Sequence, residues 1–167
     1  MTSGKLNILI PLNGEGTRFQ NADYHNTKPF VRIQGKEVLF WLLDNLDMDN
    51  IACIIVPYAA HMDNYNIQHV LRHRYKKTTF SFVPLHFSTL GALETLNIAL
   101  DSFKTSRPEL YNLPLLSLDS DSYYTTNIIE SLSNLSFKNC VYVIEDKNPD
   151  PVYSYIQTDK FNIIDIA

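Results

Sequence analysis

Two glycines and two basic residues near the start of the chain are of the types that bind phosphate groups. Gly14 and Gly16 follow an apolar run that ends at Leu12, and Arg18 and Lys28 come soon after them. Glycine lets backbone N–H groups approach an anion closely, because no side chain stands in the way. Arginine and lysine add charged hydrogen bonds to phosphate oxygens. The sequence therefore predicts a phosphate site at this loop.

The spacing of this loop excludes three common glycine motifs. A dinucleotide fingerprint or a protein-kinase glycine loop needs a third glycine at position 19, which is Phe19. A P-loop needs Gly-Lys followed by Ser or Thr, whereas other residue types follow the Gly-Lys pairs at 4–5 and 35–36. The loop is therefore a glycine loop of another kind.

Two aspartates, Asp119 and Asp121, follow the apolar run 113–118. Side chains two residues apart share one face if a strand continues through them. Mg²⁺ prefers one or two protein carboxylates together with phosphate oxygens and water. We expect a metal site here; the alternative is a polar turn that caps the next helix.

A third candidate segment lies where a helix is expected to begin, at Thr89, Gly91 and Ala92. Gly91 permits a close backbone approach, and a helix N-terminus favours negatively charged groups. Thr89 could also serve as a helix cap, a role that is compatible with nucleotide binding.

The elements that must position these residues alternate along the chain. Expected strands are 6–12, 51–57, 78–85, 113–118 and 140–145, and expected helices are 38–46, 61–74, 90–103 and 127–135. This alternation predicts an α/β fold, a three-layer Rossmann-like sandwich with a mainly parallel sheet. Two further strands, 153–158 and 162–166, are expected to form a hairpin. Ligands bind beyond the carboxyl ends of such strands, where the glycine loop and the aspartates lie.

Two finer expectations concern the core. Leu93, Leu96, Leu100 and Phe103 are expected to form one buried stripe along the helix 90–103. Cys53 and Cys140 each lie in an apolar run, where we expect small buried thiols.

Composition excludes several classes of function. The 167 residues carry 14 Lys and Arg against 18 Asp and Glu, a formal charge of −4, which argues against a general nucleic-acid binder. Two cysteines are too few for a disulfide framework or a zinc site, and no apolar run reaches the length of a membrane span. We expect a cytoplasmic protein with no nucleic-acid or membrane partner.

The run from Ile10 to Phe19, followed by Thr27-Lys28-Pro29 and by 33–38, resembles the signature of the sugar-phosphate-type nucleotidyltransferases. In that family the first strand leads into G-x-G-[ST]-R-[FL], then into K-P and a short turn before a helix. This chain departs from the pattern with Glu37 where Pro is usual and Asn13 where Ala is common. The most similar members are bacterial capsule and lipopolysaccharide enzymes that make nucleotide-activated sugars, polyols or choline.

The resemblance implies a nucleotide-diphospho-sugar transferase-like fold and transfer of a nucleoside monophosphate to a phosphorylated acceptor. It implies a nucleoside triphosphate as substrate, with CTP and UTP as the first candidates, and Mg²⁺ as cofactor. Arg18 and Lys28 would be the catalytic residues, Asp121 the metal ligand and Asp119 its support. The implied nucleotide-binding residues are Leu12, Asn13, Gly14, Glu15, Gly16, Thr17, Thr89, Gly91 and Ala92.

We expect residues 1–167 to form one nucleotidyltransferase-like domain that is incomplete at its C-terminal end compared with the family. Two other functions stay open: a nucleotide-sugar-dependent glycosyltransferase, which also uses an Asp-x-Asp metal site, and a non-catalytic nucleotide-binding module. The nucleobase, the acceptor and the oligomeric state are open as well.

Overall fold

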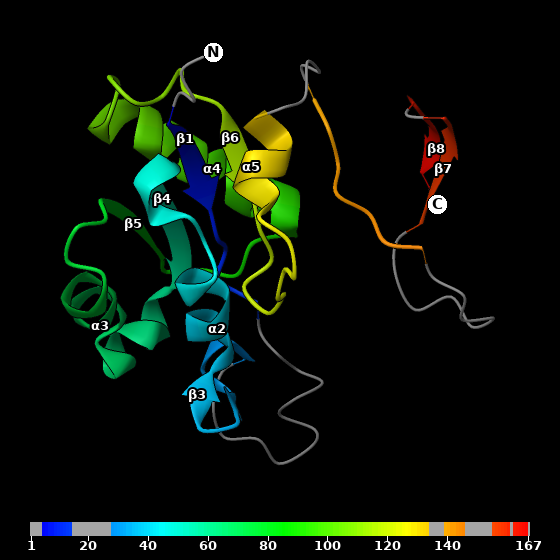
Figure 1. The fold of residues 1–167 in the computed structure, drawn as a ribbon. Coiled ribbons are helices and arrows are strands. Elements are labelled where there is room, and N and C mark those ends of the chain that lie inside the picture. The colour runs from blue at the N-terminus through cyan, green and yellow to red at the C-terminus, as the bar shows by residue number, and fades with distance from the viewer. Residues whose placement is uncertain (1–4, 15–27, 134–138, 146–154, 161, 167) are drawn as a thin grey trace. The chain divides into compact units, whose positions relative to one another are not determined.

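The computed structural model describes residues 5–14, 28–133, 139–145, 155–160 and 162–166. The chain divides into two units, Met1–Leu135 and Ser136–Ala167, which are described separately. The strands of the first unit are β1 (Leu6–Leu9), β2 (Arg32–Ile33), β3 (Lys36–Glu37), β4 (Ile51–Ala59), β5 (Phe80–Leu85) and β6 (Leu115–Ser117) (Figure 1). Its helices are α2 (Val38–Asp44), α3 (Ile67–Arg74), α4 (Ala92–Ser106) and α5 (Ile128–Ser133), with 3₁₀ turns η1 (Lys28–Phe30), η2 (Met48–Asn50) and η3 (Ala60–Tyr65).

A four-stranded sheet of order β5-β4-β1-β6 forms the centre of the first unit. Each neighbouring pair of strands is parallel. All four residues of β1 are buried, as expected for a parallel strand that is covered on both faces. The predicted parallel sheet is thereby confirmed.

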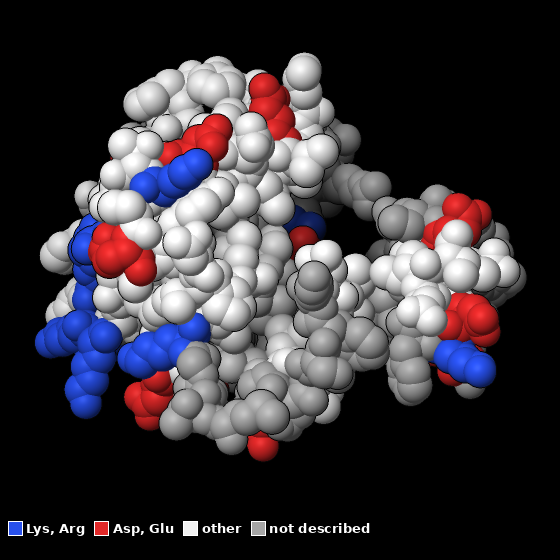
Figure 2. Space-filling model, turned by 90° about the horizontal axis from the view of Figure 1, so that it is seen from above, with Lys and Arg blue, Asp and Glu red and all other residues white. Residues whose placement is uncertain are grey.

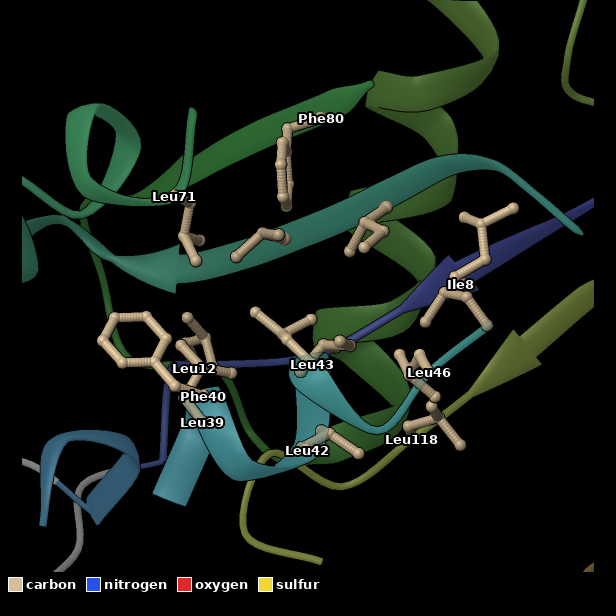
Figure 3. Close-up of a cluster of buried hydrophobic side chains, with 14 of the residues drawn as sticks. Ile8, Leu12, Leu39, Phe40, Leu42, Leu43, Leu46, Leu71, Phe80 and Leu118 are labelled. Carbon is tan, nitrogen blue, oxygen red and sulfur yellow. The ribbon is translucent and has the colours of Figure 1, made fainter. Parts of the chain in front are cut away.

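Helices cover both faces of this sheet. On one face, Ile8 of β1 belongs to a buried cluster that includes Leu39 of α2, Leu71 of α3 and Ile128 of α5 (Figure 3 shows part of it). On the other face, Leu9 packs in a second cluster with residues of β4 and α4. Alternation of β1 side chains between these clusters gives the three layers that the sequence predicts.

A tight hairpin directly precedes α2 in the chain. β2 and β3 pair antiparallel around Gln34 and Gly35, both of which have positive φ, 52° and 80°. Two positive φ angles suit the right-handed twist of a two-residue hairpin, and glycine adopts them without strain. The predicted helix 61–74 is likewise divided at Asn66, whose φ of 51° separates η3 from α3.

Two packing expectations are wrong. Leu93 is 83% exposed. The helix α4 packs through its buried residues Thr95, Ala99 and Phe103. Leu93 precedes Thr95 by two positions, or about 200° around the helix, and therefore lies on the opposite side. Cys140 is exposed, and the run 140–145 forms no strand, although its residues are apolar. An apolar run becomes a strand only where a neighbouring backbone completes its hydrogen bonds. Cys53 is buried as expected, and burial raises the pKa of its thiol to about 11.

The second unit contains the predicted hairpin. β7 (Ile156–Asp159) and β8 (Asn162–Ile166) pair antiparallel, with Asp159 opposite Asn162 at the turn. Lys160 has a φ of 55° there.

The described surface carries charge of both signs. Figure 2 shows blue and red residues near one another on a face that is mostly white. None of the described helices has the length and hydropathy needed to cross a membrane.

One charged cluster joins α2, β3 and the end of α3. The Asp44 carboxylate contacts Lys36 and Arg74, both at 2.7 Å, and accepts a hydrogen bond of 2.6 Å from the Tyr75 hydroxyl. Burial acts to raise the pKa of Asp44, but the hydrogen bonds from Arg74, Lys36 and Tyr75 outweigh it and lower the pKa from 3.8 to about 2. The ionised carboxylate therefore stabilises the fold.

We predict that Asp44→Asn lowers the free energy of unfolding by about 1–2 kcal/mol at pH 6, since charge-assisted hydrogen bonds are lost. Because the folded pKa is depressed, the stabilisation is full above the unfolded pKa and disappears as pH falls through about 2. The difference between wild type and variant in urea unfolding should thus be smaller at pH 3 than at pH 6. Asp101→Asn, at an exposed position on α4, is the control. Equal differences at both pH values would contradict the prediction.

Candidate nucleotide site

A cavity of about 800 Å³ lies at the carboxyl ends of the parallel strands. Its walls come from the segments that follow β1, β4, β5 and β6, together with the first turn of α4. Among the residues named from the sequence, it is lined by Asn13, Gly14, Lys28, Thr89, Gly91, Ala92, Asp119 and Asp121. The structure therefore brings the three candidate segments to one place.

The chain enters the cavity wall directly from β1. Leu12 is buried, and its N–H donates to the Pro57 carbonyl at 2.7 Å, which extends the β1–β4 pairing past the strand. Gly14 lies at the cavity, and a Cβ added to it would meet nothing within 4 Å. Its backbone is therefore open to a ligand. Glu15, Gly16, Thr17 and Arg18 lie outside the described residues.

Lys28 and Asp121 form an ion pair within the cavity. Lys28 begins η1, which the buried Pro29 anchors. Asp121 follows β6, whose position is fixed where the Leu118 N–H donates to the Leu9 carbonyl at 2.9 Å. Both charged side chains remain partly exposed, at 42% and 32%. A cation and an anion are thus held together where a phosphate and a metal ion would each find an opposite charge.

The carboxylates suit a hard divalent cation. Asp119, Ser120 and Asp121 all line the cavity. Burial raises the pKa of Tyr124, and the negative charges of Asp119 and Asp121 raise it further, so this corner is electronegative. Within the described part of the chain, no group of three or more His, Cys, Asp or Glu could hold a metal ion. Two carboxylates fit Mg²⁺, which takes its remaining ligands from phosphate oxygens and water.

The start of α4 forms another wall of the cavity. The Glu94 side chain accepts a hydrogen bond of 2.6 Å from the Leu90 N–H, and the Thr95 N–H donates to the Gly91 carbonyl at 3.2 Å. A Cβ on Gly91 would also meet nothing within 4 Å. The amide of Asn13 donates to the hydroxyls of Thr89 and Thr95, which ties the β1 end to this helix.

Further residues that line the cavity were not assigned to the site from the sequence, among them His86, Phe87, Ser88 and Thr95. Ala59 pairs with Leu85 in the β4–β5 register, so the segments after these strands leave the sheet side by side. His86 and Phe87 could have been assigned to the site because they directly follow a predicted strand. Thr95 carried no signal, because a threonine within a helix has no distinctive spacing.

Neither a family model nor a curated protein sequence matches this chain. Solved structures do. The nucleoside-diphosphate-sugar pyrophosphorylase from Vibrio cholerae RC9 matches 96% of this chain and 66% of its own, with a TM-score of 0.69 and 14% identity. HddC from Yersinia pseudotuberculosis gives a TM-score of 0.67 at 17% identity, covering 96% of this chain and 68% of its own. HddC has also been solved in complex with GMP-PN.

The inositol-1-phosphate CTP transferase from T. maritima matches 98% of this chain and 64% of its own, with a TM-score of 0.66 and 15% identity. The chain thus spans about two thirds of the length of these structures. It has the nucleotide-diphospho-sugar transferase fold. The predicted fold, and the resemblance to sugar-phosphate-type nucleotidyltransferases at the level of the fold, are confirmed.

We predict that Lys28→Ala tightens binding of Mn²⁺, used as a probe for Mg²⁺, by about 2–5-fold in the absence of nucleotide. An exposed ion pair contributes up to about 1 kcal/mol, and the variant frees Asp121 of its competing cation. Asp121→Asn should weaken the same binding. Isothermal titration of each protein measures both effects.

Lys36→Ala is the matched control, because Lys36 pairs with Asp44 and does not line the cavity. Equal Mn²⁺ affinity in Asp121→Asn and wild type would show that Asp121 does not bind the ion.

Proposed function

We propose that this chain is the nucleotide-binding part of a nucleotidyltransferase of the sugar-phosphate type. The reaction would transfer a nucleoside monophosphate from a nucleoside triphosphate to a phosphorylated sugar, polyol or choline-like acceptor. The observation that carries the proposal is the convergence of Lys28, Asp121, Gly14 and Gly91 on one cavity at the carboxyl edge of the sheet. The fold supports it, since a pyrophosphorylase and a CTP transferase share that fold.

In this reaction a phosphate oxygen of the acceptor attacks the α-phosphorus of the nucleotide. The bond from that phosphorus to the α–β bridging oxygen breaks, and pyrophosphate leaves with the electron pair. Such transfers depend on positioning and on charge stabilisation rather than on side-chain acid–base chemistry. Lys28 would contact the α-phosphate, and Arg18 the departing β,γ-phosphates.

The remaining residues would hold the substrate. The backbone from Leu12 to Thr17 would cradle base and phosphates, and Thr89, Gly91 and Ala92 would contact base and ribose. Asp121, supported by Asp119, would hold Mg²⁺, which offsets negative charge at the reacting phosphates.

The dimensions of the sheet support this arrangement. β5 and β6 are the two outer strands, three interstrand spacings apart, or about 14 Å. That separation suits a nucleotide whose base lies near the β5 end and whose phosphates lie near Asp121. CTP and UTP are the first candidates, and the product would be an activated precursor for polysaccharide synthesis in the cytoplasm.

We predict that one nucleotide in a panel of CTP, UTP, GTP, ATP and dTTP with Mg²⁺ stabilises the chain. Ligand at 100 times its Kd contributes about 2.7 kcal/mol, or about 5–10 °C in Tm for a domain of this size. A thermal-shift assay measures the effect. No shift with any nucleotide would overturn the proposed site.

The transfer itself is tested by pyrophosphate release with glucose 1-phosphate, glycerol 3-phosphate and phosphocholine as acceptors. If the chain turns over, Arg18→Ala and Lys28→Ala should each lower the rate by about 10²-fold or more, as loss of one charge-stabilising group does. Lys36→Ala should retain the wild-type rate. Normal release by Lys28→Ala would contradict the assigned role, and nucleotide binding without release would favour a binding module.

A further inference from the structure

Three polar side chains connect two walls of the cavity, the segment after β1 and the start of α4. Asn13 Nδ2 donates to Thr95 Oγ1 at 2.7 Å and to Thr89 Oγ1 at 3.2 Å, and the two hydroxyls are 2.7 Å apart. Asn13 follows β1, whereas Thr89 precedes α4 and Thr95 lies in its first turn. The contacts span 76 and 82 residues of sequence, so the network is a tertiary link.

The geometry of the contacts decides how the hydrogens are shared. The two threonine oxygens are only 2.7 Å apart and lie 2.7 and 3.2 Å from Asn13 Nδ2. The two N–H bonds of a planar amide diverge by about 120°, too widely to reach one oxygen each, so a single N–H of Asn13 lies between both hydroxyls. The one hydrogen of the Thr95 hydroxyl can go to the Gly91 carbonyl at 3.3 Å or to Thr89, and either threonine can donate to the other. Rotation of the Asn13 side chain removes its N–H from both hydroxyls at once.

Burial makes the loss of any hydrogen-bond partner in this network costly. Thr95 has 0% exposure, so water cannot replace a lost partner of its hydroxyl. A buried polar group that loses its partner carries the full cost of desolvation. The Asn13 amide is therefore held at one place relative to α4, and the adjacent Gly14 is held with it.

We propose that Asn13 is a positioning residue that fixes the distance between the Gly14 and Gly91 segments before a nucleotide arrives. This inference rests on the proposed nucleotide site. The backbone of Asn13 is expected to bind the nucleotide, and the inference adds a role for its side chain. A ligand that spans both segments then binds without first having to order them, which favours affinity. The same network leaves the backbone at both glycines open to that ligand.

The test compares Asn13→Ala, Thr95→Val and Thr95→Ser. Thr95→Val keeps the shape and removes the hydroxyl, whereas Thr95→Ser keeps the hydroxyl. Thr105→Val is the matched control, because Thr105 also lies on α4 and its hydroxyl donates to the carbonyl four residues earlier, yet it is exposed. Calorimetry with the tightest-binding Mg²⁺–nucleotide of the five named above gives Kd, and thermal unfolding without nucleotide gives Tm.

We expect Asn13→Ala and Thr95→Val each to raise Kd by about tenfold, as loss of one or two hydrogen bonds allows. The double variant should bind no more weakly than Asn13→Ala alone, because both changes break one network. Thr95→Ser and Thr105→Val should retain the wild-type Kd. If Asn13→Ala and Thr95→Val lower Tm but leave Kd unchanged at a temperature well below Tm, their role is structural only and the proposal is overturned. Additive losses of affinity in the double variant would also overturn it.

Hydrogen exchange of the nucleotide-free protein tests the positioning without relying on the proposed function. Asn13→Ala should speed exchange across 89–96, and Thr95→Val should speed exchange across 12–14, while Thr105→Val changes neither. Absence of this reciprocal effect would overturn the positioning role even if nucleotides bind. If wild type binds no nucleotide but the reciprocal effect is present, the proposed function fails and the link between the two segments stands.

Discussion

The pairing of β1 on both of its edges is the constraint on which the rest of this molecule depends. Its backbone is hydrogen-bonded to β4 on one side and to β6 on the other, and all of its side chains are buried. Because the three strands are parallel, their carboxyl ends meet at one edge of the sheet. Gly14, His61 and Asp121 follow these ends and reach the same cavity. A shift in the register of β1 would move Gly14 away from His61 and Asp121.

Local sequence patterns were sufficient for the parts of the structure that depend on local chemistry. Gly14, Lys28, Asp119 and Asp121, which the patterns single out, line one cavity at the carboxyl edge of the sheet. The parallel sheet follows from strand and helix alternation, since a parallel connection needs a crossover. The wrong expectations, such as a strand at 140–145, concerned segments whose fate depends on partners that a pattern does not specify.

Contacts between distant side chains could not be predicted in the same way. The ion pair of Lys28 and Asp121 and the link from Asn13 to Thr95 depend on tertiary placement at ångström precision. No periodicity or motif encodes which lysine faces which aspartate. The first of these pairs joins residues that the sequence had assigned to separate ligands, phosphate and metal. Their ion pair places opposite charges side by side, so a metal–phosphate complex bound as we propose would give each of them a new partner.

The position of β1 at the centre of the sheet has a consequence for biosynthesis. Among the described strands of its sheet, β1 is synthesised before its partners: β4 follows more than 40 residues later and β6 more than 100 residues later. Until then its apolar residues have no permanent partner, and such unpaired strands are prone to misassociation. Loops of this length also slow folding, because chain entropy is lost before contacts form. The cavity therefore cannot be complete until the segment after β6 has been synthesised and β6 has paired with β1.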